Sequence, residues 1–309
     1  MNQIVMIKMQ SKYLKICSLL LLLVIAYSCS EPSGPKTYPA PVTELLATSI
    51  DSTTVSIKWH PSTTESDAAF DRYVVTIAGT DGFTRIDTIL RVSNPYQVSR
   101  LKPDVVYRFD VNAMIRNGDL SEKTSVVWSP AFRFTDLTTD KPIRIYEADR
   151  GDGSGLDLFN PENQMARVLH VDSAIYWNLG LMINDSAYFG APKLLNYNYN
   201  DAALIRTEIT DYYFDMPSMN LVYTPESLVK GNFSECLINL TAIEPQIKSN
   251  LILIVRTMEI PFSDWNYAKV LIRKNGEKLI QGSGNNRFIE CEISYQKIRG
   301  IPYAKKPIH

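Results

Sequence analysis

The chain has 309 residues, a formal net charge of −1 at pH 7 and 45% hydrophobic residues. A charge so close to zero argues against nucleic acid as a partner, because domains that bind nucleic acid carry a basic patch. The length allows two domains behind a leader segment, each large enough to bury a core of its own.

The first 28 residues have the pattern of a secretory signal. An apolar run from Leu19 to Ala26 follows three lysines, and no acidic residue precedes Cys29. The run is shorter than the roughly 20 residues that a membrane-spanning helix needs. The small residues Ala26 and Ser28 stand before Cys29, and this arrangement resembles a bacterial lipobox. An ordinary signal that is cleaved near Ser28, with Cys29 incidental, is the alternative.

The lipobox resemblance implies that residues 1–28 are a lipoprotein signal peptide and that Cys29 carries the lipid, a palmitate-type acyl chain. Residues 29–38 are rich in Pro, Gly and Ser and would form the lipidated tether. The expected location is the outer membrane, with the protein anchored by its lipid at the cell surface.

Residues 39–137 show short strand patterns separated by turns. Apolar and polar residues alternate over Val55–Trp59, Tyr73–Ile77 and Val105–Ala113. Turn sequences stand between such runs at Asp81-Gly82 and Asn117-Gly118. Several short alternating strands with this spacing indicate an antiparallel β-sandwich.

This region resembles a fibronectin type III module. The matching positions are Pro41, Leu45, Trp59, Tyr73, the run Leu101–Pro103 with Tyr107, and the turn Gly118–Ser121. The resemblance implies a tyrosine corner, in which the Tyr107 hydroxyl bonds a backbone group upstream. Such modules serve as spacers, adhesion surfaces or docking units, so the resemblance implies a fold and no chemistry.

Residues 142–309 also have the pattern of a β domain. The strand-like runs are Ala174–Leu179, Asp211–Phe214, Leu251–Val255, Tyr267–Ile272 and Phe288–Ile293. No long stretch has helical periodicity, although Thr224–Val229 could form one or two turns. The chain is therefore expected to be all-β, a fibronectin type III sandwich followed by a second, mainly antiparallel β domain.

The second region resembles the HmuY-type haem-binding lipoproteins. The resemblance rests on Trp177–Leu181, Asp157–Phe159, the pair Leu253–Thr257 and Tyr267–Ile272, and Phe288–Tyr295. It implies a surface β domain that holds haem between two loop side chains, histidines in some members and methionines in others. No histidine occurs from residue 171 to 308, so Met216 and Met219 are the candidate ligands. A packing role for these methionines is the alternative.

Aromatic residues crowd between Tyr176 and Tyr223 and point to a different ligand. Tyr197 and Tyr199 alternate with asparagine, which places both rings on one face of an extended segment. Exposed rings stack on sugars or on a flat macrocycle, whereas buried rings form core. These two tyrosines are the candidate contacts for a glycan.

An enzyme is not expected. No G-x-S-x-G, H-E-x-x-H or phosphate-loop pattern occurs in the sequence. The histidines are His60, His170 and His309. Asp149, Asp152 and Asp157 surround three glycines and invite a calcium loop, but their spacing favours a solvated turn, and no metal site is predicted.

The predicted function is that of a cell-surface lipoprotein that binds haem or a related macrocycle for uptake, with an outer-membrane receptor or transporter as partner. The alternatives are a surface glycan-binding or adhesion protein, and a non-catalytic scaffold that docks on an outer-membrane partner. Cys236 and Cys291 both lie in strand-like runs. An exported chain can bridge such a pair, and two buried free thiols are the equal alternative.

Overall fold

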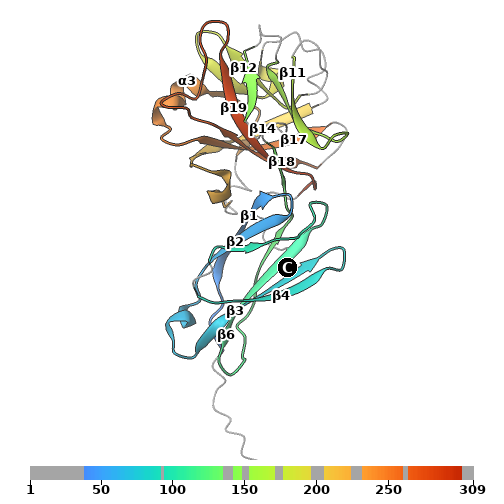
Figure 1. Cartoon of the computed structure of the whole chain (residues 1–309), viewed down its shortest axis with the longest axis vertical. Coiled ribbons are helices and arrows are strands. Elements are labelled where there is room, and N and C mark those ends of the chain that lie inside the picture. Colours follow the sequence, from blue (N-terminus) through green and yellow to red (C-terminus); the bar gives the residue numbers. More distant parts are fainter. Residues whose placement is uncertain are drawn as a thin grey trace, which may run out of the picture. The chain divides into compact units, whose positions relative to one another are not determined.

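The computed structural model describes residues 38–91, 94–134, 142–147, 153–170, 177–195, 205–223, 232–259 and 264–300 (Figure 1). The chain divides into two units, Met1–Tyr38 and Pro39–His309, and every element below belongs to the second. Described strands pair antiparallel throughout, which confirms the predicted all-β class. No helix in the described ranges is long and apolar enough to cross a membrane.

The N-terminal part of the second unit is a sandwich of two sheets. One sheet has the order β1-β2-β5 and the other β4-β3-β6-β7. The bounds are β1 Thr43–Asp51, β2 Thr54–His60, η1 Thr63–Ser66, β3 Phe70–Gly79, β4 Thr84–Ile89, β5 Tyr96–Val98, β6 Tyr107–Ile115 and β7 Thr124–Trp128. The predicted turns Asp81-Gly82 and Asn117-Gly118 join β3 to β4 and β6 to β7, where both glycines have positive φ.

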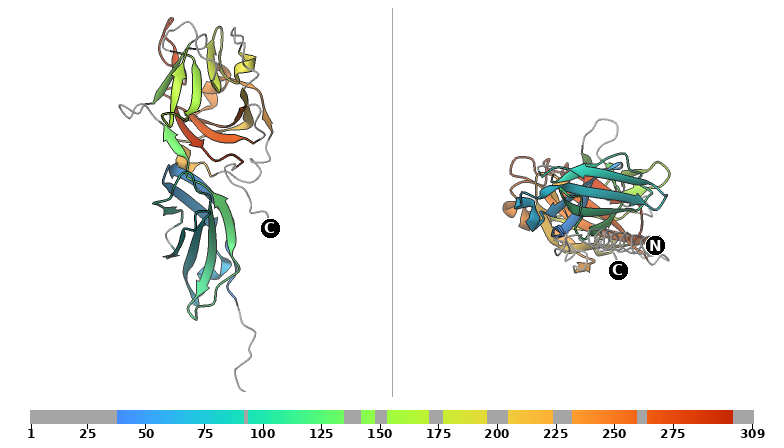
Figure 2. Two further views of the ribbon diagram at one scale, coloured as in Figure 1. Left: turned by 90° about the vertical axis from the view of Figure 1, so that its right-hand side faces the viewer. Right: turned by 90° about the horizontal axis from the view of Figure 1, so that it is seen from below.

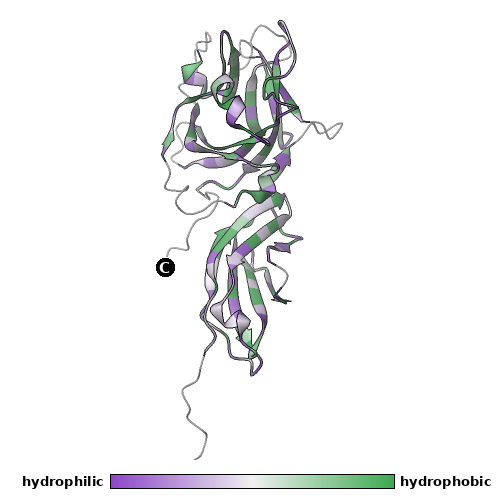
Figure 3. Ribbon diagram, turned by 90° about the vertical axis from the view of Figure 1, so that its left-hand side faces the viewer, coloured by the Kyte–Doolittle hydropathy of each residue, from purple (hydrophilic) through white to green (hydrophobic). Residues whose placement is uncertain are grey.

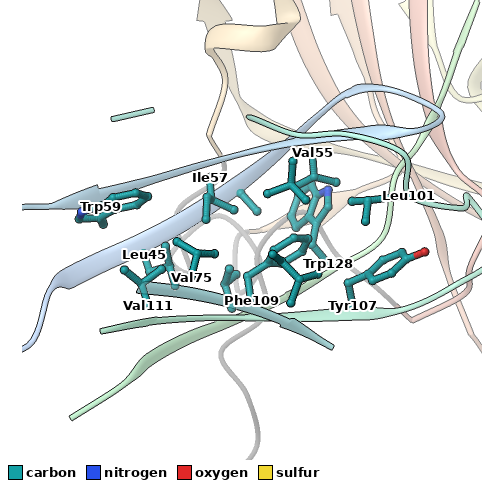
Figure 4. Packing of buried hydrophobic residues seen from close by; sticks show 14 of the residues in the cluster. Leu45, Val55, Ile57, Trp59, Val75, Leu101, Tyr107, Phe109, Val111 and Trp128 are labelled. Carbon is teal, nitrogen blue, oxygen red and sulfur yellow. The ribbon is translucent and has the colours of Figure 1, made fainter. Parts of the chain in front are cut away.

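The sandwich core is built from residues that alternate along the strands. Val55, Ile57 and Trp59 point from β2 into the same layer as Phe109 and Val111 of β6 (Figure 4). Bands of green and purple along the strands show the same alternation of hydropathy (Figure 3). Because successive strand side chains point to opposite faces, this alternation sets which residues are buried.

The predicted tyrosine corner is present. The Lys102 backbone N–H donates to the Tyr107 hydroxyl at 2.9 Å. The Tyr107 ring is buried among the core residues of the sandwich (Figure 4). Burial raises the pKa of the Tyr107 hydroxyl, so the group stays neutral and ties the segment before β6 to the sheet.

The C-terminal part has two further sheets. The smaller has the order β11-β10-β12-β13-β16, and the larger runs β15-β14-β17-β18-β19-β8, with β9 also paired to β19. The bounds are β8 Phe132–Phe134, β9 Ile143–Tyr146, β10 Gly155–Asn160, β11 Met165–Leu169, β12 Leu179–Ile183, β13 Ala187–Gly190, η2 Pro192–Leu194, β14 Ile205–Asp215, η3 Met219–Leu221, β15 Phe233–Ser234, β16 Leu237–Asn239, α3 Leu240–Ile243, η4 Glu244–Gln246, β17 Leu251–Glu259, β18 Asn266–Ile272 and β19 Phe288–Gln296.

The larger sheet is buried on both faces at β17. Leu253 and Val255 pack on one face against Leu156 and Leu181 of the smaller sheet. Ile254, on the other face, belongs to the core cluster that includes the sandwich. This explains why the β17 sequence is a continuous apolar run rather than an alternating one. The green strands β10–β12 and the orange to red strands β17–β19 form separate layers (Figure 2).

The sandwich and the larger sheet meet at a junction with its own polar contacts. The Lys269 ammonium, on β18, donates to the Thr48 hydroxyl of β1 at 2.8 Å. The Gln296 side chain of β19 donates to the Ser129 carbonyl at 2.8 Å. Residues 132–134, which the expected boundary at 137 placed in the first domain, form β8 and pair with β19.

Cys236 and Cys291 are both free thiols in the structure, and of the two only Cys291 is buried. Cys291 is fully buried on β19 in the larger sheet, whereas Cys236 precedes β16 in the smaller sheet. Burial raises the pKa of both thiols, which keeps them protonated and unreactive.

Candidate functional site

The two candidate methionine ligands lie in different environments. Met216 is 36% exposed just after β14, whereas Met219 is 1% exposed in η3. Met219 belongs to the core cluster that also contains Val222 and Ile252. Its sulfur is therefore packed into the junction, where a ligand reaches it only if the junction opens. Tyr197, Tyr199 and Cys29 lie outside the described residues.

A pocket of about 400 Å³ lies between the two sheets of the C-terminal part. The smaller sheet contributes side chains from β10 and β11, and the larger sheet contributes side chains from β14, β17, β18 and β19. Small-molecule sites in proteins have volumes of roughly 300–1,000 Å³, so the pocket is large enough for a small ligand.

Asn178 fixes one wall of the pocket. Its Oδ1 accepts the Leu158 backbone N–H at 2.7 Å, and its Nδ2 donates to the Thr257 hydroxyl at 2.9 Å. These two bonds connect β10 of the smaller sheet to β17 of the larger one. The amide is therefore held in one orientation, which prepares the wall for binding.

Thr257 and Asn266 form the opposite wall as a cross-strand pair on β17 and β18. The Asn266 amide donates to the Gln296 and Lys297 carbonyls at 3.1 and 3.0 Å. Its Oδ1 accepts no hydrogen bond, and the Thr257 hydroxyl accepts one from Asn178 but donates none, within the part of the chain that the structure describes. Both residues are more than nine-tenths buried.

Asp157 places a carboxylate in the same pocket. Its Oδ2 accepts from Arg167 Nε at 2.8 Å across the β10–β11 pair. Burial raises the pKa of Asp157, and the Arg167 guanidinium opposes this rise. The carboxylate thus serves an ion pair rather than a calcium loop, and its predicted partners Asp149 and Asp152 lie outside the described residues.

Two aromatic rings close the apolar side of the pocket. Phe159 and Tyr295 stack with their centroids 4.9 Å apart and their planes at 2°. The rings come from opposite sheets, β10 and β19, so their contact holds the two walls together.

The described lining combines acidic, neutral polar and aromatic side chains. It contains no histidine, cysteine or methionine among the described residues, whereas the carboxylates of Asp157, Glu162 and Glu259 all belong to it. In the described ranges, no group of three His, Cys, Asp or Glu side chains is placed to hold a metal ion.

Sequence reasoning did not identify this pocket, although one signal was available. An asparagine stands between two apolar residues in Trp177–Leu181, and a buried amide in such a run needs hydrogen-bond partners. Thr257 and Asn266 carry no comparable local signal, because they meet Asn178 only through the pairing of β17 with β18.

Comparison with known proteins identifies the N-terminal sandwich. Residues 40–128 match the family model of the fibronectin type III domain. No curated protein matches the sequence. Similar solved structures include the FN5 domain of Drosophila Lar (21% identity, 30% of this chain and 96% of that one, TM-score 0.25) and an FN3 domain of human collagen XX (14%, 33% and 99%, 0.26).

A two-domain fibronectin type III segment from chicken tenascin is also similar, at 13% identity over 86% of this chain and 98% of that one, with a TM-score of 0.26. Fibronectin type III domains commonly mediate binding or adhesion, and their fold is typically non-catalytic. The family model and the strand order of the sandwich show that residues 40–128 form a fibronectin type III domain.

Proposed function

We propose that the chain is a non-catalytic, lipid-anchored binding protein whose C-terminal domain holds a small polar ligand between its two sheets. One observation carries the proposal: the pocket is walled by buried polar groups that are fixed in place and still have unused hydrogen-bonding capacity. Buried polar groups normally find partners, so a lining of this kind is prepared for a hydrogen-bonding ligand.

The fibronectin type III domain supports a role in binding or adhesion. It would carry the C-terminal domain away from the membrane, to which the lipid on Cys29 would attach the tether. In this arrangement the glycan alternative of the sequence analysis fits the pocket better than the haem hypothesis does, because the described lining offers no imidazole or thioether to iron.

The HmuY-like resemblance and the haem function that it implies stay predictions. Tyr197 and Tyr199 lie outside the described residues and keep their predicted role as glycan contacts. Each carbohydrate-binding measurement should therefore be accompanied by a haemin titration of the same protein.

The test uses the chain from Ser30 onward, which contains the whole compact unit Pro39–His309. We expect binding on a glycan array that is lost in Ile205→Trp, because Ile205 lines the pocket and a larger side chain fills it. The control is Ile86→Trp, since Ile86 is exposed on β4 of the sandwich.

A second variant keeps the test informative if Ile205→Trp does not fold. Thr257→Val removes one hydroxyl at nearly constant volume and should weaken binding by roughly tenfold, the value of one hydrogen bond lost to a ligand. The proposal fails if no glycan binds the wild-type chain, or if both pocket variants bind as the wild type does. A saturable one-to-one Soret shift with haemin, unchanged by Ile205→Trp, would move the function away from this pocket.

A further inference from the structure

The pocket has an excess of acidic side chains. Asp157, Glu162 and Glu259 line it, and among the described residues of the lining Arg167 is the single basic one. Arg167 is paired with Asp157. The Glu162 carboxylate has no ion-pair partner in the described ranges, and its side chain lies at the exposed β10–β11 connection. The ion-pair partner of Glu259 among the described residues is Arg299, at 4.0 Å.

The neutral polar groups of the lining leave hydrogen-bonding capacity of both kinds unused. Asn266 donates its amide protons to two backbone carbonyls, and its Oδ1 remains able to accept a hydrogen bond from a ligand. The Asn178 Oδ1 and one of its amide protons are used within the protein. The unused capacity includes acceptors, namely the carboxylate oxygens and the Asn266 Oδ1, and donors, namely the second Asn178 amide proton and the Asn160 amide, while the Thr257 hydroxyl is still able to donate.

An anion gains little in such a site. A carboxylate ligand would be repelled by the exposed carboxylates of Glu162 and Glu259, and the guanidinium of Arg167, the basic residue of the described lining, is already paired with Asp157. A ligand with several O–H donors satisfies the acceptors, and a protonated amine also meets the unpaired Glu162. The stacked Phe159 and Tyr295 rings supply an apolar surface for C–H groups.

We infer that the pocket selects a hydroxyl-rich ligand that carries an amine, of the amino-sugar class, over neutral and anionic sugars. The inference rests on the proposed function, since it names the ligand class for the same pocket. It assigns the charge preference to Glu162 and the hydrogen-bond acceptance to Asn266.

The test compares three oligosaccharide probes of equal length by calorimetry. The first is an oligomer of glucosamine at a pH below the pKa of its amine, the second is the same oligomer N-acetylated, and the third is an oligouronate. We expect the amine form to bind roughly tenfold more tightly than the acetylated form, and the oligouronate to bind most weakly. The preference for the amine should shrink as salt is added.

Two variants locate the preference. Glu162→Gln removes only a charge and should reduce the amine-to-acetyl ratio by about threefold, consistent with one exposed charge pair. Glu122→Gln makes the same chemical change on the fibronectin type III domain, where Glu122 is exposed, and should leave the ratio unchanged.

The outcomes separate the inference from the proposed function. If the oligouronate binds best and Ile205→Trp abolishes its binding, the pocket is confirmed as a site and the inferred ligand class is wrong. If the amine form binds equally well to Ile205→Trp, the attraction lies elsewhere and the inference fails. If none of the probes binds but the array finds a ligand that Ile205→Trp removes, only the ligand class is overturned. If nothing binds in either measurement, both fail.

Discussion

Lys269 is a long cationic side chain enclosed at the junction of the two domains. Its ammonium donates to the Thr48 hydroxyl and to the Val222 carbonyl, at 2.8 and 2.6 Å. Burial and the nearby Arg133 lower the pKa of Lys269 to about 7. Burial among neutral oxygen partners disfavours the charged form of the Lys269 amine. The protonation of Lys269 is therefore linked to the free energy of folding.

We expect the free energy of unfolding to rise with pH between about 7 and 10.5, the folded and ordinary pKa values of Lys269. In this interval the unfolded chain binds a proton that the folded chain does not, so raising the pH favours the folded state. The slope from this group should approach about 1.4 kcal/mol per pH unit. Urea unfolding at a series of pH values measures it.

Lys269→Met isolates this effect because it keeps the side-chain length and removes the amine. The variant should lose the slope, whereas Lys278→Met, at an exposed position, should keep it. An equal slope in wild type and Lys269→Met would show that other groups produce the pH dependence.

Among the single elements, β12 shows how Trp177, which precedes it, restricts the size of a strand residue. Gly180 of β12 lies opposite Gly155 of β10, and both glycines pack against the fully buried Trp177 indole. A Cβ at Gly180 would lie 2.5 Å from the indole and 2.5 Å from the Leu195 side chain. The small residue in Trp177–Leu181 is therefore explained by packing, without any ligand.

Gly180→Ala should destabilise the chain by about 2–3 kcal/mol, because the indole is rigid and cannot give way to the new methyl group. Thermal and urea unfolding measure the loss. Gly82→Ala is the comparison: its Cβ meets nothing within 4 Å, and only the positive φ opposes it, at about 1 kcal/mol. A loss below about 0.5 kcal/mol for Gly180→Ala would mean that the strand adjusts more easily than this packing implies.

At the scale of the whole molecule, the fibronectin type III domain and the C-terminal domain share a junction. Arg133 donates to the Ile50 carbonyl at 3.1 Å and to the Asn220 side chain at 2.5 Å. The hydroxyls of Ser56 and Tyr223 lie 2.8 Å apart. The segment that contains Met219 thus contacts both domains, so we expect them to unfold as one unit.

Met219→Ala should destabilise this unit by about 2–5 kcal/mol, the cost of a large-to-small change in a core, and both domains should still unfold in one transition. Met216→Ala, three residues earlier and 36% exposed, should change stability by less than about 0.5 kcal/mol. Denaturant unfolding followed by fluorescence distinguishes the two. Equal and small effects, with loss of a haemin Soret shift in both variants, would instead support paired thioether ligation.

The proposed lipid attachment at Cys29 leads to a separate prediction. Cys29→Ser should abolish incorporation of labelled palmitate and move the chain from the membrane fraction to the soluble fraction. The reason is that the Cys29 sulfur is the atom to which the lipid would be attached. Cys17→Ser, within the predicted signal, is the control and should keep both the label and the membrane fraction. Retention of label in Cys29→Ser would contradict the lipobox hypothesis.

Much of the fold was predictable because its signals are local. The alternation over Val55–Trp59 sets the buried face of β2, and the apolar run from Leu251 is β17. The tyrosine corner at Tyr107 follows from residues a few positions apart. Each of these features depends on neighbours in the sequence, so local patterns were enough to predict an all-β chain with a fibronectin type III domain in its N-terminal half.

The candidate pocket, in contrast, depends on contacts between residues that are far apart in the sequence. The packing of β10 over the β17–β18 pair brings together Asn178, Thr257 and Asn266. No spacing of residues in the sequence indicates this contact. Tertiary packing likewise placed Met219 in a core and Met216 at the surface, although both stand in one short segment. The physical reason is that periodicity assigns a side chain to a face of its strand, whereas burial depends on which distant sheet covers that face.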